Sequence, residues 1–583
     1  MNALTFSSGY MPARIRAGYA PSRIRLADIR RTYLVTAQLR LLLLLAAFTL
    51  VAAAALLRIA YLGVVQPAPQ QHSMADALLP PRGAITDRNG IALARAFPAY
   101  ALWYEPDALG DGGPPLVKPP AEVARQLKAI FPDLDLAKTT RLLASGKPGY
   151  IRRRVLPEEV NRINAIGELA LETPSEQDRQ YPQGKLAAHV LGYVAADGHG
   201  RVGMESFLDK RLLDPAERGK PVPLSIDLRV QGALEDELAA GMRAVNAVGA
   251  AGIVLDVDTG EVMALASLPS FDPNRIDAAG EKLMFNRVTN QVYELGSTFK
   301  PLTVAAAIDA GTVTDLSRRY SATPYPISGY TIKDLKPKGS SLNVPEMLIH
   351  SSNVVTAHVV EGLGTARLKQ TMIDLGMNER PYIEVPAKGF PIWPGGNWPL
   401  LRGVTVGYGH GIAVTPLHLA SAYAAMVNGG IWRPTTLMKL EPGEAPRGRR
   451  VFKASTSARM NQLLRMISVY GTGRNANAPG FRVGGKTGSA EKPSAGGYAK
   501  SSLVSTFAAA FPMDRPRFVV IVMYDEPKGT AASSFQRTAA WNAAPTVGRL
   551  VPRIGPMLGV MPDATRDIDL SDLKPLVGDG GGE

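Results

Sequence analysis

The sequence contains no cysteine among its 583 residues, and this absence removes several classes of chemistry. Without cysteine there is no disulfide, thiolate nucleophile, iron–sulfur cluster or cysteine-bearing zinc site. Histidine is scarce, with seven residues and no His-Glu-x-x-His pattern that would bind zinc. No G-x-S-x-G elbow is present around Ser297, which argues against an α/β-hydrolase. Acidic residues are outnumbered, because 51 Asp and Glu face 65 Lys and Arg, which gives a net charge of +14. This excess favours a polyanion or a membrane surface as a partner.

The location of the positive charge favours the membrane. Residues 1–40 hold seven arginines and one acidic residue, and the run 41–57 that follows has no charge before Arg58. About 20 apolar residues cross the hydrocarbon core of a bilayer. A buried core helix, a cleaved signal peptide or a nucleic-acid-binding arm fits this pattern less well. We therefore predict a cytoplasmic basic arm over 1–40 and one uncleaved transmembrane anchor over 41–62, with the remainder outside the membrane.

Residues 63–222 mix short apolar runs with turn signals and show no catalytic constellation. The segment begins with a Pro/Gln-rich linker over 66–80, and helical periodicity appears in Ala121–Phe131 and Pro157–Leu169. We predict a non-catalytic pedestal or spacer domain.

Residues 223–560 have a different character. Gly252–Val257 and Glu261–Ala266 flank an Asp-Thr-Gly turn and predict a β-hairpin, and Arg517–Tyr524 predicts a further strand. Strands at both ends of this region enclose helical patterns, which indicates an α+β domain. The acidic, Gly-rich residues 561–583 predict a flexible tail. The helical patterns are Gln231–Val245, Leu302–Ala310 and Leu417–Val427.

Three short segments of this region carry possible chemistry. Ser297 and Lys300 are spaced by one helical turn, so that the amine and the hydroxyl share a face at a helix start. A desolvated lysine can activate a serine nucleophile. The other two segments are Ser351-Ser352-Asn353 and Lys486-Thr487-Gly488-Ser489. Each is weak by itself, but the ordered set Ser-x-x-Lys, Ser-x-Asn, Lys-Thr-Gly is typical of penicillin-binding enzymes.

The third segment also matches a P-loop pattern formally. Gly480–Thr487 reads G-x-x-x-x-G-K-T, but neither an apolar strand before it nor a helix after it is predicted. We interpret the segment as an extended edge strand that a substrate backbone can approach closely. His350 adjoins the Ser-x-Asn segment, and His410 lies in a Gly-rich turn. Both are predicted to be structural.

Together the motifs resemble the class B penicillin-binding proteins, the peptidoglycan D,D-transpeptidases. The resemblance covers nearly the whole chain after the anchor, and Gly407–Gly411 with Val414–Leu417 is more similar to the cell-division members than to the elongation members. Ser489 stands where the family usually has Thr, and the serine retains the hydroxyl. Further similar motifs are Arg82-Gly83, Asp87–Gly90, Arg179-x-Tyr181-Pro182, Gly203-x-Glu205 and Gly471-Thr472-Gly473.

The resemblance implies a fold and a set of catalytic residues. It implies an α+β chain with an anchor helix, a mixed α/β pedestal of the dimerisation type, and a C-terminal, β-lactamase-like transpeptidase domain with a central antiparallel sheet flanked by helices. It further implies that Ser297 attacks the D-Ala-D-Ala carbonyl to form an acyl-enzyme and that Lys300 accepts its proton. Ser351 and Lys486 then relay a proton to the leaving D-alanine.

The resemblance also implies a substrate-binding set. Asn353 would bond the substrate amide, and Thr487, Gly488 and Ser489 would form the substrate-binding strand, with both hydroxyls on the terminal carboxylate. The backbone N–H groups of Ser297 and Ser489 would form an oxyanion hole. No metal or organic cofactor is implied.

The implied partners are peptidoglycan stem peptides, β-lactams, a membrane-embedded glycan polymerase and other division proteins, with no nucleic acid. The implied location is the inner membrane, with the catalytic domain in the periplasm. Four alternatives stay open: an elongation-specific transpeptidase, a membrane-bound β-lactamase or carboxypeptidase, a β-lactam sensor, and a non-catalytic division scaffold. No glycosyltransferase module is evident between the anchor and Ser297.

Overall fold

The computed structural model describes residues 26–64, 82–109, 116–195, 197–276, 278–494 and 497–577. They belong to two compact units, Met1–Leu78 and Leu79–Glu583. The predicted basic arm up to residue 25 and the linker 66–80 lie outside the described residues.

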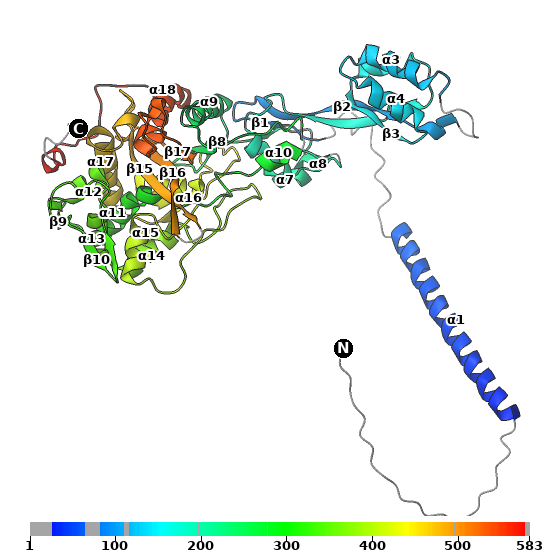
Figure 1. Ribbon diagram of the computed structural model, residues 1–583, viewed down its shortest axis with the longest axis horizontal. Helices are drawn as coiled ribbons and strands as arrows, with labels where there is room; N and C mark the ends of the chain where they lie inside the picture. The colour runs from blue at the N-terminus through cyan, green and yellow to red at the C-terminus, as the bar shows by residue number, and fades with distance from the viewer. Residues whose placement is uncertain are drawn as a thin grey trace, which may run out of the picture. The chain divides into compact units, whose positions relative to one another are not determined.

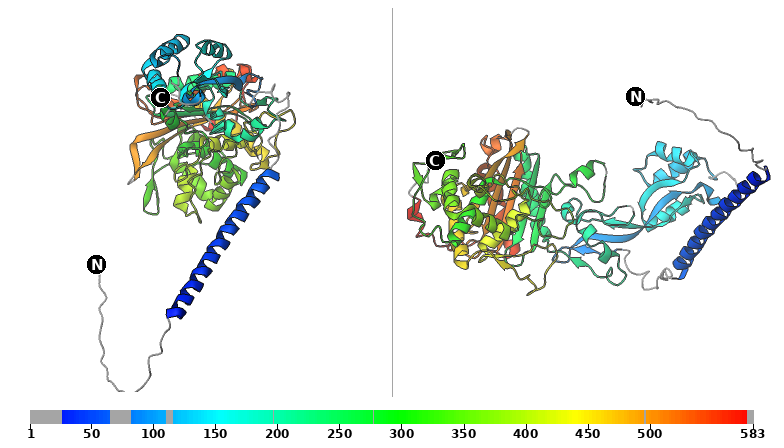
Figure 2. Two further views of the ribbon diagram at one scale, coloured as in Figure 1. Left: turned by 90° about the vertical axis from the view of Figure 1, so that its right-hand side faces the viewer. Right: turned by 90° about the horizontal axis from the view of Figure 1, so that it is seen from below.

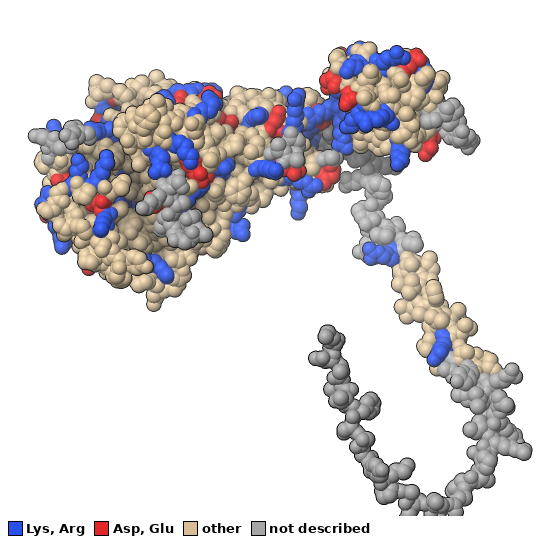
Figure 3. All heavy atoms as spheres, viewed as in Figure 1, with Lys and Arg blue, Asp and Glu red and all other residues tan. Residues whose placement is uncertain are grey.

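The first unit contains a single helix, α1 (Leu26–Val64). Its segment Ala37–Arg58 is long and apolar enough to cross a membrane, and none of it is buried within the protein. The sequence has no charged residue over 41–57, and Figure 3 shows an uncharged stretch along this helix. An isolated helix that exposes apolar side chains on all faces is consistent with a single-pass membrane anchor.

The pedestal is built on a six-stranded sheet in which β2 (Ala92–Tyr104) is the central strand. β2 pairs with β1 (Ile85–Thr86), β3 (Gly149–Val155), β4 (Leu171–Glu172) and β5 (Ser175–Gln180), and β1 pairs in parallel with β6 (Val222–Pro223). One end of the sheet is covered by helices whose apolar residues form a core with Leu102 and Tyr104. These helices are α3 (Pro120–Ile130), α4 (Leu136–Ala144) and α5 (Pro157–Asn164).

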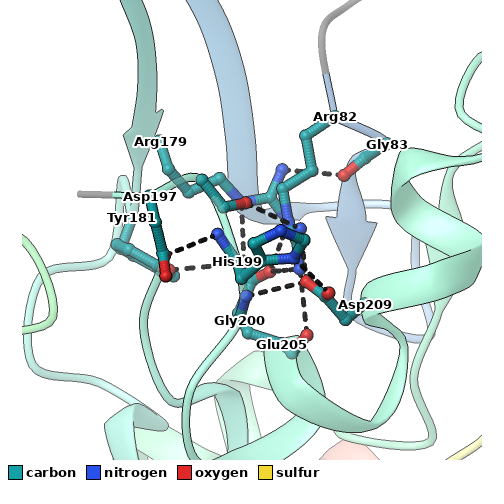
Figure 4. A network of polar contacts seen from close by, with 10 residues as sticks. Arg82, Gly83, Arg179, Tyr181, Asp197, His199, Gly200, Glu205 and Asp209 are labelled. Carbon is teal, nitrogen blue, oxygen red and sulfur yellow. Dashed lines mark hydrogen bonds and ion pairs between the residues drawn. The ribbon is translucent and has the colours of Figure 1, made fainter. Parts of the chain in front are cut away.

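A buried ion network ties the pedestal together (Figure 4). Glu205, at 0 % exposure, accepts hydrogen bonds from the guanidinium groups of both Arg82, at 2.8 Å, and Arg179, at 2.6 Å. Arg82 also pairs with Asp209 at 2.8 Å, and Arg179 donates to the carbonyl of Gly83 at 2.7 Å. Because these motif residues are separated by up to 127 positions, the network fixes distant segments to one another. The short helices that carry its acids are α7 (Gly203–Phe207) and α8 (Asp209–Leu213).

The C-terminal domain is organised around a five-stranded antiparallel sheet of order β15-β16-β17-β7-β8 (Figure 1). β8, the partner of β7 in the hairpin that begins the domain, forms one edge, and β15 forms the other edge. This places the Lys-Thr-Gly segment on an edge strand, as predicted. The strands are β7 (Gly249–Asp256), β8 (Val262–Leu268), β15 (Gly484–Ser494), β16 (Gly497–Phe511) and β17 (Phe518–Asp525).

Helices cover both faces of this sheet, and the strand side chains alternate between the two cores. In β17, Val520 and Val522 join the core beneath α9 (Leu228–Ala244) and α18 (Ala543–Ile554). Val519 and Ile521 instead join the larger core on the opposite face. This is the period of two that a strand buried on both faces requires. Figures 1 and 2 show the resulting layers.

The helical layer on the second face carries the other motifs. It contains α11 (Lys300–Asp309), α12 (Val344–His350), α13 (Asn353–Leu363), α14 (Thr365–Asp374), α15 (Leu400–Gly407), α16 (Pro416–Val427) and α17 (Ala454–Tyr470).

The structure confirms the predicted fold class, the hairpin β7–β8, the strand β17 and the helices α9, α11 and α16. It also excludes the P-loop, because Lys486 and Thr487 lie inside β15 and no helix follows them. The predicted flexible tail is wrong for residues 561–577, which pack on the domain and bury Leu573 and Val577 in the core. Residues 578–583 lie outside the described residues.

Candidate active site

Ser297 lies in the tight 3₁₀ turn Gly296–Phe299 that leads directly into α11. Gly296 has a φ of +55°, so a residue with a side chain would be strained here. Its N–H donates a hydrogen bond to the Gly409 carbonyl at 3.1 Å. The Tyr423 hydroxyl of α16 donates to the Thr298 carbonyl at 2.7 Å and fixes the turn to that helix. Ser297 is therefore partly exposed on a rigid turn at the start of a helix.

Lys300 begins α11 and is fully buried. Its Nζ donates to the Ser351 carbonyl oxygen and, at 3.1 Å, to the Ser351 Oγ. The structure thus brings the first motif to the second. Among the described residues the Ser297 hydroxyl makes no side-chain hydrogen bond, and catalytic contacts of this kind often tighten only when substrate binds.

Ser351 ends α12 in a left-handed conformation, with a φ of +62°. A non-glycine residue in this region is held there by its surroundings and is common at functional sites. Ser352 then caps α13, accepting from the Val355 N–H at 3.1 Å. The helix break between α12 and α13 aims the Ser351 side chain at the lysines.

Lys486 reaches the same hydroxyl from the sheet. Its Nζ donates to the Ser351 Oγ at 2.9 Å and to the Thr487 carbonyl at 3.0 Å. Ser351 therefore lies between two buried amines that come from α11 and β15. All four predicted catalytic residues occupy this region, with three of them in direct contact.

Burial changes the protonation of both lysines. Desolvation lowers the pKa of Lys486 to about 7. Desolvation, with a smaller repulsion from the Lys486 charge, lowers the pKa of Lys300 well below its usual range, while Asp334 opposes the shift. A buried amine with a lowered pKa releases its proton readily and can act as a base near neutral pH.

The Lys-Thr-Gly strand packs directly on the Ser297 turn. A side chain at Gly488 would meet the Leu295 carbonyl at 2.4 Å, so this position needs glycine for the close approach. The Thr487 hydroxyl shares a hydrogen bond of 2.8 Å with Thr472, and the Ser489 Oγ accepts from the Ala539 N–H at 3.1 Å. Both hydroxyls are thereby held in place along the edge of β15.

Asn353 and Ser489 line one cleft of about 650 Å³. Tyr408 and His410 lie on its wall, and burial together with the Lys300 charge lowers the pKa of His410 to about 4. His410, which the sequence predicted to be only structural, is thus a neutral side chain at the cleft.

Sequence reasoning missed Asp334. Its carboxylate accepts from the Ser352 Oγ at 2.6 Å and from the backbone N–H groups of Asn353, at 2.5 Å, and Val354, at 3.1 Å. A negative charge is favourable at the start of α13. No motif surrounds Asp334, so the sequence offered no signal for it.

Two protein-family models match this chain. The family model described as "Penicillin binding protein transpeptidase domain" matches residues 250–545, and the "Penicillin-binding Protein dimerisation domain" matches residues 77–220. The chain is 37 % identical over 489 residues to the probable peptidoglycan D,D-transpeptidase FtsI of Caulobacter vibrioides, and the matched region covers 82 % of each chain. It is 32 % identical to the probable peptidoglycan D,D-transpeptidase PenA of Neisseria gonorrhoeae, over 77 % of this chain and 81 % of the relative.

The fold is also that of solved penicillin-binding proteins. Penicillin binding protein 3 of Mycobacterium tuberculosis, complexed with aztreonam, superposes with a TM-score of 0.65 at 23 % identity, covering 84 % of this chain and 99 % of that one. A peptidoglycan synthetase of Bifidobacterium adolescentis gives 0.64 at 22 % identity, with 84 % and 97 % covered. The chain belongs to the class B penicillin-binding protein transpeptidases, with a dimerisation domain ahead of the transpeptidase domain.

Proposed function

We propose that this protein is a septal peptidoglycan D,D-transpeptidase that works through an acyl-enzyme on Ser297. The observation that carries the proposal is the pair of buried lysines that meet at Ser351 beside the Ser297 turn. The identity to relatives named FtsI and PenA supports the transpeptidase reaction and the division role.

In the first step the Ser297 oxygen bonds to the carbonyl carbon between the two terminal D-alanines. Lys300, with its lowered pKa, takes the serine proton. The carbon–nitrogen bond to the terminal D-alanine breaks, and Ser351 and Lys486 pass a proton to the leaving amine. The N–H groups of Ser297 and Ser489 hold the developing oxyanion.

In the second step an amine of a neighbouring stem peptide attacks the ester carbonyl. A new amide bond forms, the bond to the serine oxygen breaks, and the proton of the amine returns to that oxygen through the same lysines. The hydroxyls of Thr487 and Ser489 bind the substrate carboxylate, and Asn353 bonds the substrate amide. A β-lactam presents a similar carbonyl and carboxylate, so it acylates Ser297 in the same way.

We also propose the topology and the partners. The arginines before the anchor place the N-terminus in the cytoplasm and the transpeptidase domain in the periplasm. The chain then supplies cross-linking alone, and a membrane-embedded polymerase supplies the glycan strand.

A fluorescent penicillin tests the reaction. The wild-type protein should be labelled covalently, whereas Ser297→Ala should not be labelled. Asn378→Ala, away from the cleft, is the matched control and should be labelled like the wild type. Labelling of Ser297→Ala would refute the assignment.

Two cellular experiments test the role and the topology. Depletion should give filaments with unfinished septa, whereas round or swollen cells would favour the elongation role. Protease added outside the inner membrane should cleave near residue 500, and protection there would refute the proposed orientation.

A further inference from the structure

Residues 563–577, which we call the C-terminal strap, run across the domain and end near the motif that carries Ser351. The strap follows the last long helix, α18, and none of its residues belongs to the cleft described above. Composition alone predicts a solvated tail, so its fixed position needs an explanation.

The first end of the strap is fastened to the loop that precedes β15. The Asp563 N–H donates to the Gly480 carbonyl at 2.9 Å, and Arg482 donates to the Asp563 carbonyl at 3.2 Å. Arg566 pairs with Asp514 at 2.6 Å, and the same carboxylate accepts from Arg482 at 2.6 Å. This end of the strap therefore holds the entry to the Lys-Thr-Gly strand.

The centre of the strap neutralises a buried arginine. Arg465 on α17 is 7 % exposed, and it pairs with Asp567 through two of its nitrogens at 2.6–2.9 Å. Its third nitrogen donates to the Val483 carbonyl at 2.9 Å and to the Asn477 side chain at 2.8 Å. Val483 directly precedes β15, so one guanidinium joins the strap to the strand of Lys486.

The second end of the strap is fastened to α12. Leu573 is buried in the core, and the Asn343 side chain donates to the Leu576 carbonyl at 2.7 Å. The same Asn343 caps α12, accepting from the Glu346 N–H at 2.8 Å. That helix ends at Ser351.

The strap thus holds both elements whose side chains meet at 2.9 Å in the active site, Lys486 on β15 and Ser351 after α12. We propose that the C-terminal strap is a positioning device for the active site and that Asp567, acting through Arg465, sets the rate of acylation at Ser297. Without the carboxylate, Arg465 keeps a buried charge with only neutral partners, and it can be stabilised only by shifting toward solvent. That shift would release the Val483 carbonyl and move the start of β15.

The test compares Asp567→Asn with a matched control on the same strap. Asp572 also pairs with an arginine of α17, Arg459, at 2.5 Å, but the Arg459 side chain is 35 % exposed against 8 % for Arg465. Among the described residues Arg459 makes no hydrogen bond to β15 or to the residue before it. We expect Asp567→Asn in the full-length protein to lower the rate of acylation by fluorescent penicillin by about ten-fold, since small displacements of catalytic groups have large effects on rate. Asp572→Asn should react like the wild type, and Asp567→Glu, which keeps the carboxylate, should recover most of the rate.

The measurement separates positioning from stability. Rates are followed on folded protein well below the melting temperature. The dependence of the rate on penicillin concentration separates the affinity for penicillin from the first-order rate of acylation. We expect the loss in the first-order rate. A lowered melting temperature with an unchanged rate, or equal losses in Asp567→Asn and Asp572→Asn, would overturn the inference. The inference rests on the proposed acylation of Ser297, and an unlabelled wild-type protein would instead refute that proposal.

Discussion

The pedestal and the active site each bury two basic side chains, but they treat the charge differently. In the pedestal, Arg82 and Arg179 share the carboxylate of Glu205 (Figure 4). In the active site, Lys300 and Lys486 share the Ser351 hydroxyl, and among the described residues neither forms an ion pair with a carboxylate. A paired buried charge serves as a structural link, whereas an unpaired one is destabilised in its charged form. The comparison suggests that the pedestal network maintains structure and the lysines maintain reactivity.

The largest expected effect comes from removing a buried lysine of the active site. Lys300→Met should lower the rate of acylation by penicillin about 10²- to 10⁴-fold, as expected for loss of a general base. Its free energy of unfolding should be equal to or higher than that of the wild type, because the cost of burying an amine whose pKa is lowered is removed. Stopped-flow labelling and thermal unfolding measure the two quantities.

Lys138→Met, at an exposed position of α4, is the control and should leave both quantities unchanged. A Lys300→Met protein that is clearly less stable than the wild type, or that reacts equally fast, would show that the two regions do not differ in this way.

The second prediction removes the shared carboxylate of the pedestal. Glu205→Gln leaves two buried guanidinium groups without their main counter-charge, and we expect a loss of about 3–5 kcal/mol in the free energy of unfolding. Denaturant titration of the region after the anchor helix measures this loss. A loss below about 1 kcal/mol would mean that the network is not the link proposed here.

The third prediction concerns pH. Because the pKa of Lys486 is lowered to about 7 in the folded protein and is near 10.5 when the chain is unfolded, the unfolded state binds more protons between these values. The destabilisation is therefore complete below pH 7 and is relieved as the pH rises, by about 1 kcal/mol between pH 7 and 8. Unfolding titrations should show a rise that is larger by about this amount in the wild type than in Lys486→Met, because Lys300, whose pKa is also lowered, contributes a rise to both proteins. An equal rise in both proteins would contradict the lowered pKa.

The smallest expected effect is at the surface. Arg553 pairs with Asp236 at 3.1 Å, and both side chains are largely exposed. Asp236→Asn should change the free energy of unfolding by less than about 1 kcal/mol. A loss comparable to that of Glu205→Gln would show that burial does not control the strength of these pairs.

The residues themselves predicted part of this structure. The apolar anchor, the hairpin β7–β8 and the strand β17 follow from local periodicity, since each pattern is contained in one segment. The spacing of three residues between Ser297 and Lys300 follows from the sequence alone, although the structure places Ser297 in a 3₁₀ turn just before the helix that Lys300 begins. The meeting of Lys300, Ser351 and Lys486 required the family resemblance, because no local pattern relates segments that lie far apart in sequence.

Two features escaped sequence reasoning for the same reason. Asp334 caps α13 from a loop with no motif. The strap was predicted to be solvated because its acidic composition is typical of frayed tails. Its carboxylates in fact meet Arg459 and Arg465, about a hundred residues earlier in the chain.

The most direct test of the account is the position of the penicillin adduct. Mass spectrometry of a tryptic digest should find the adduct on the peptide that contains Ser297 and none on the peptide that contains Ser351, although Ser351 contacts both lysines. An adduct on Ser351, or on any residue other than Ser297, would contradict the assignment of nucleophile and relay.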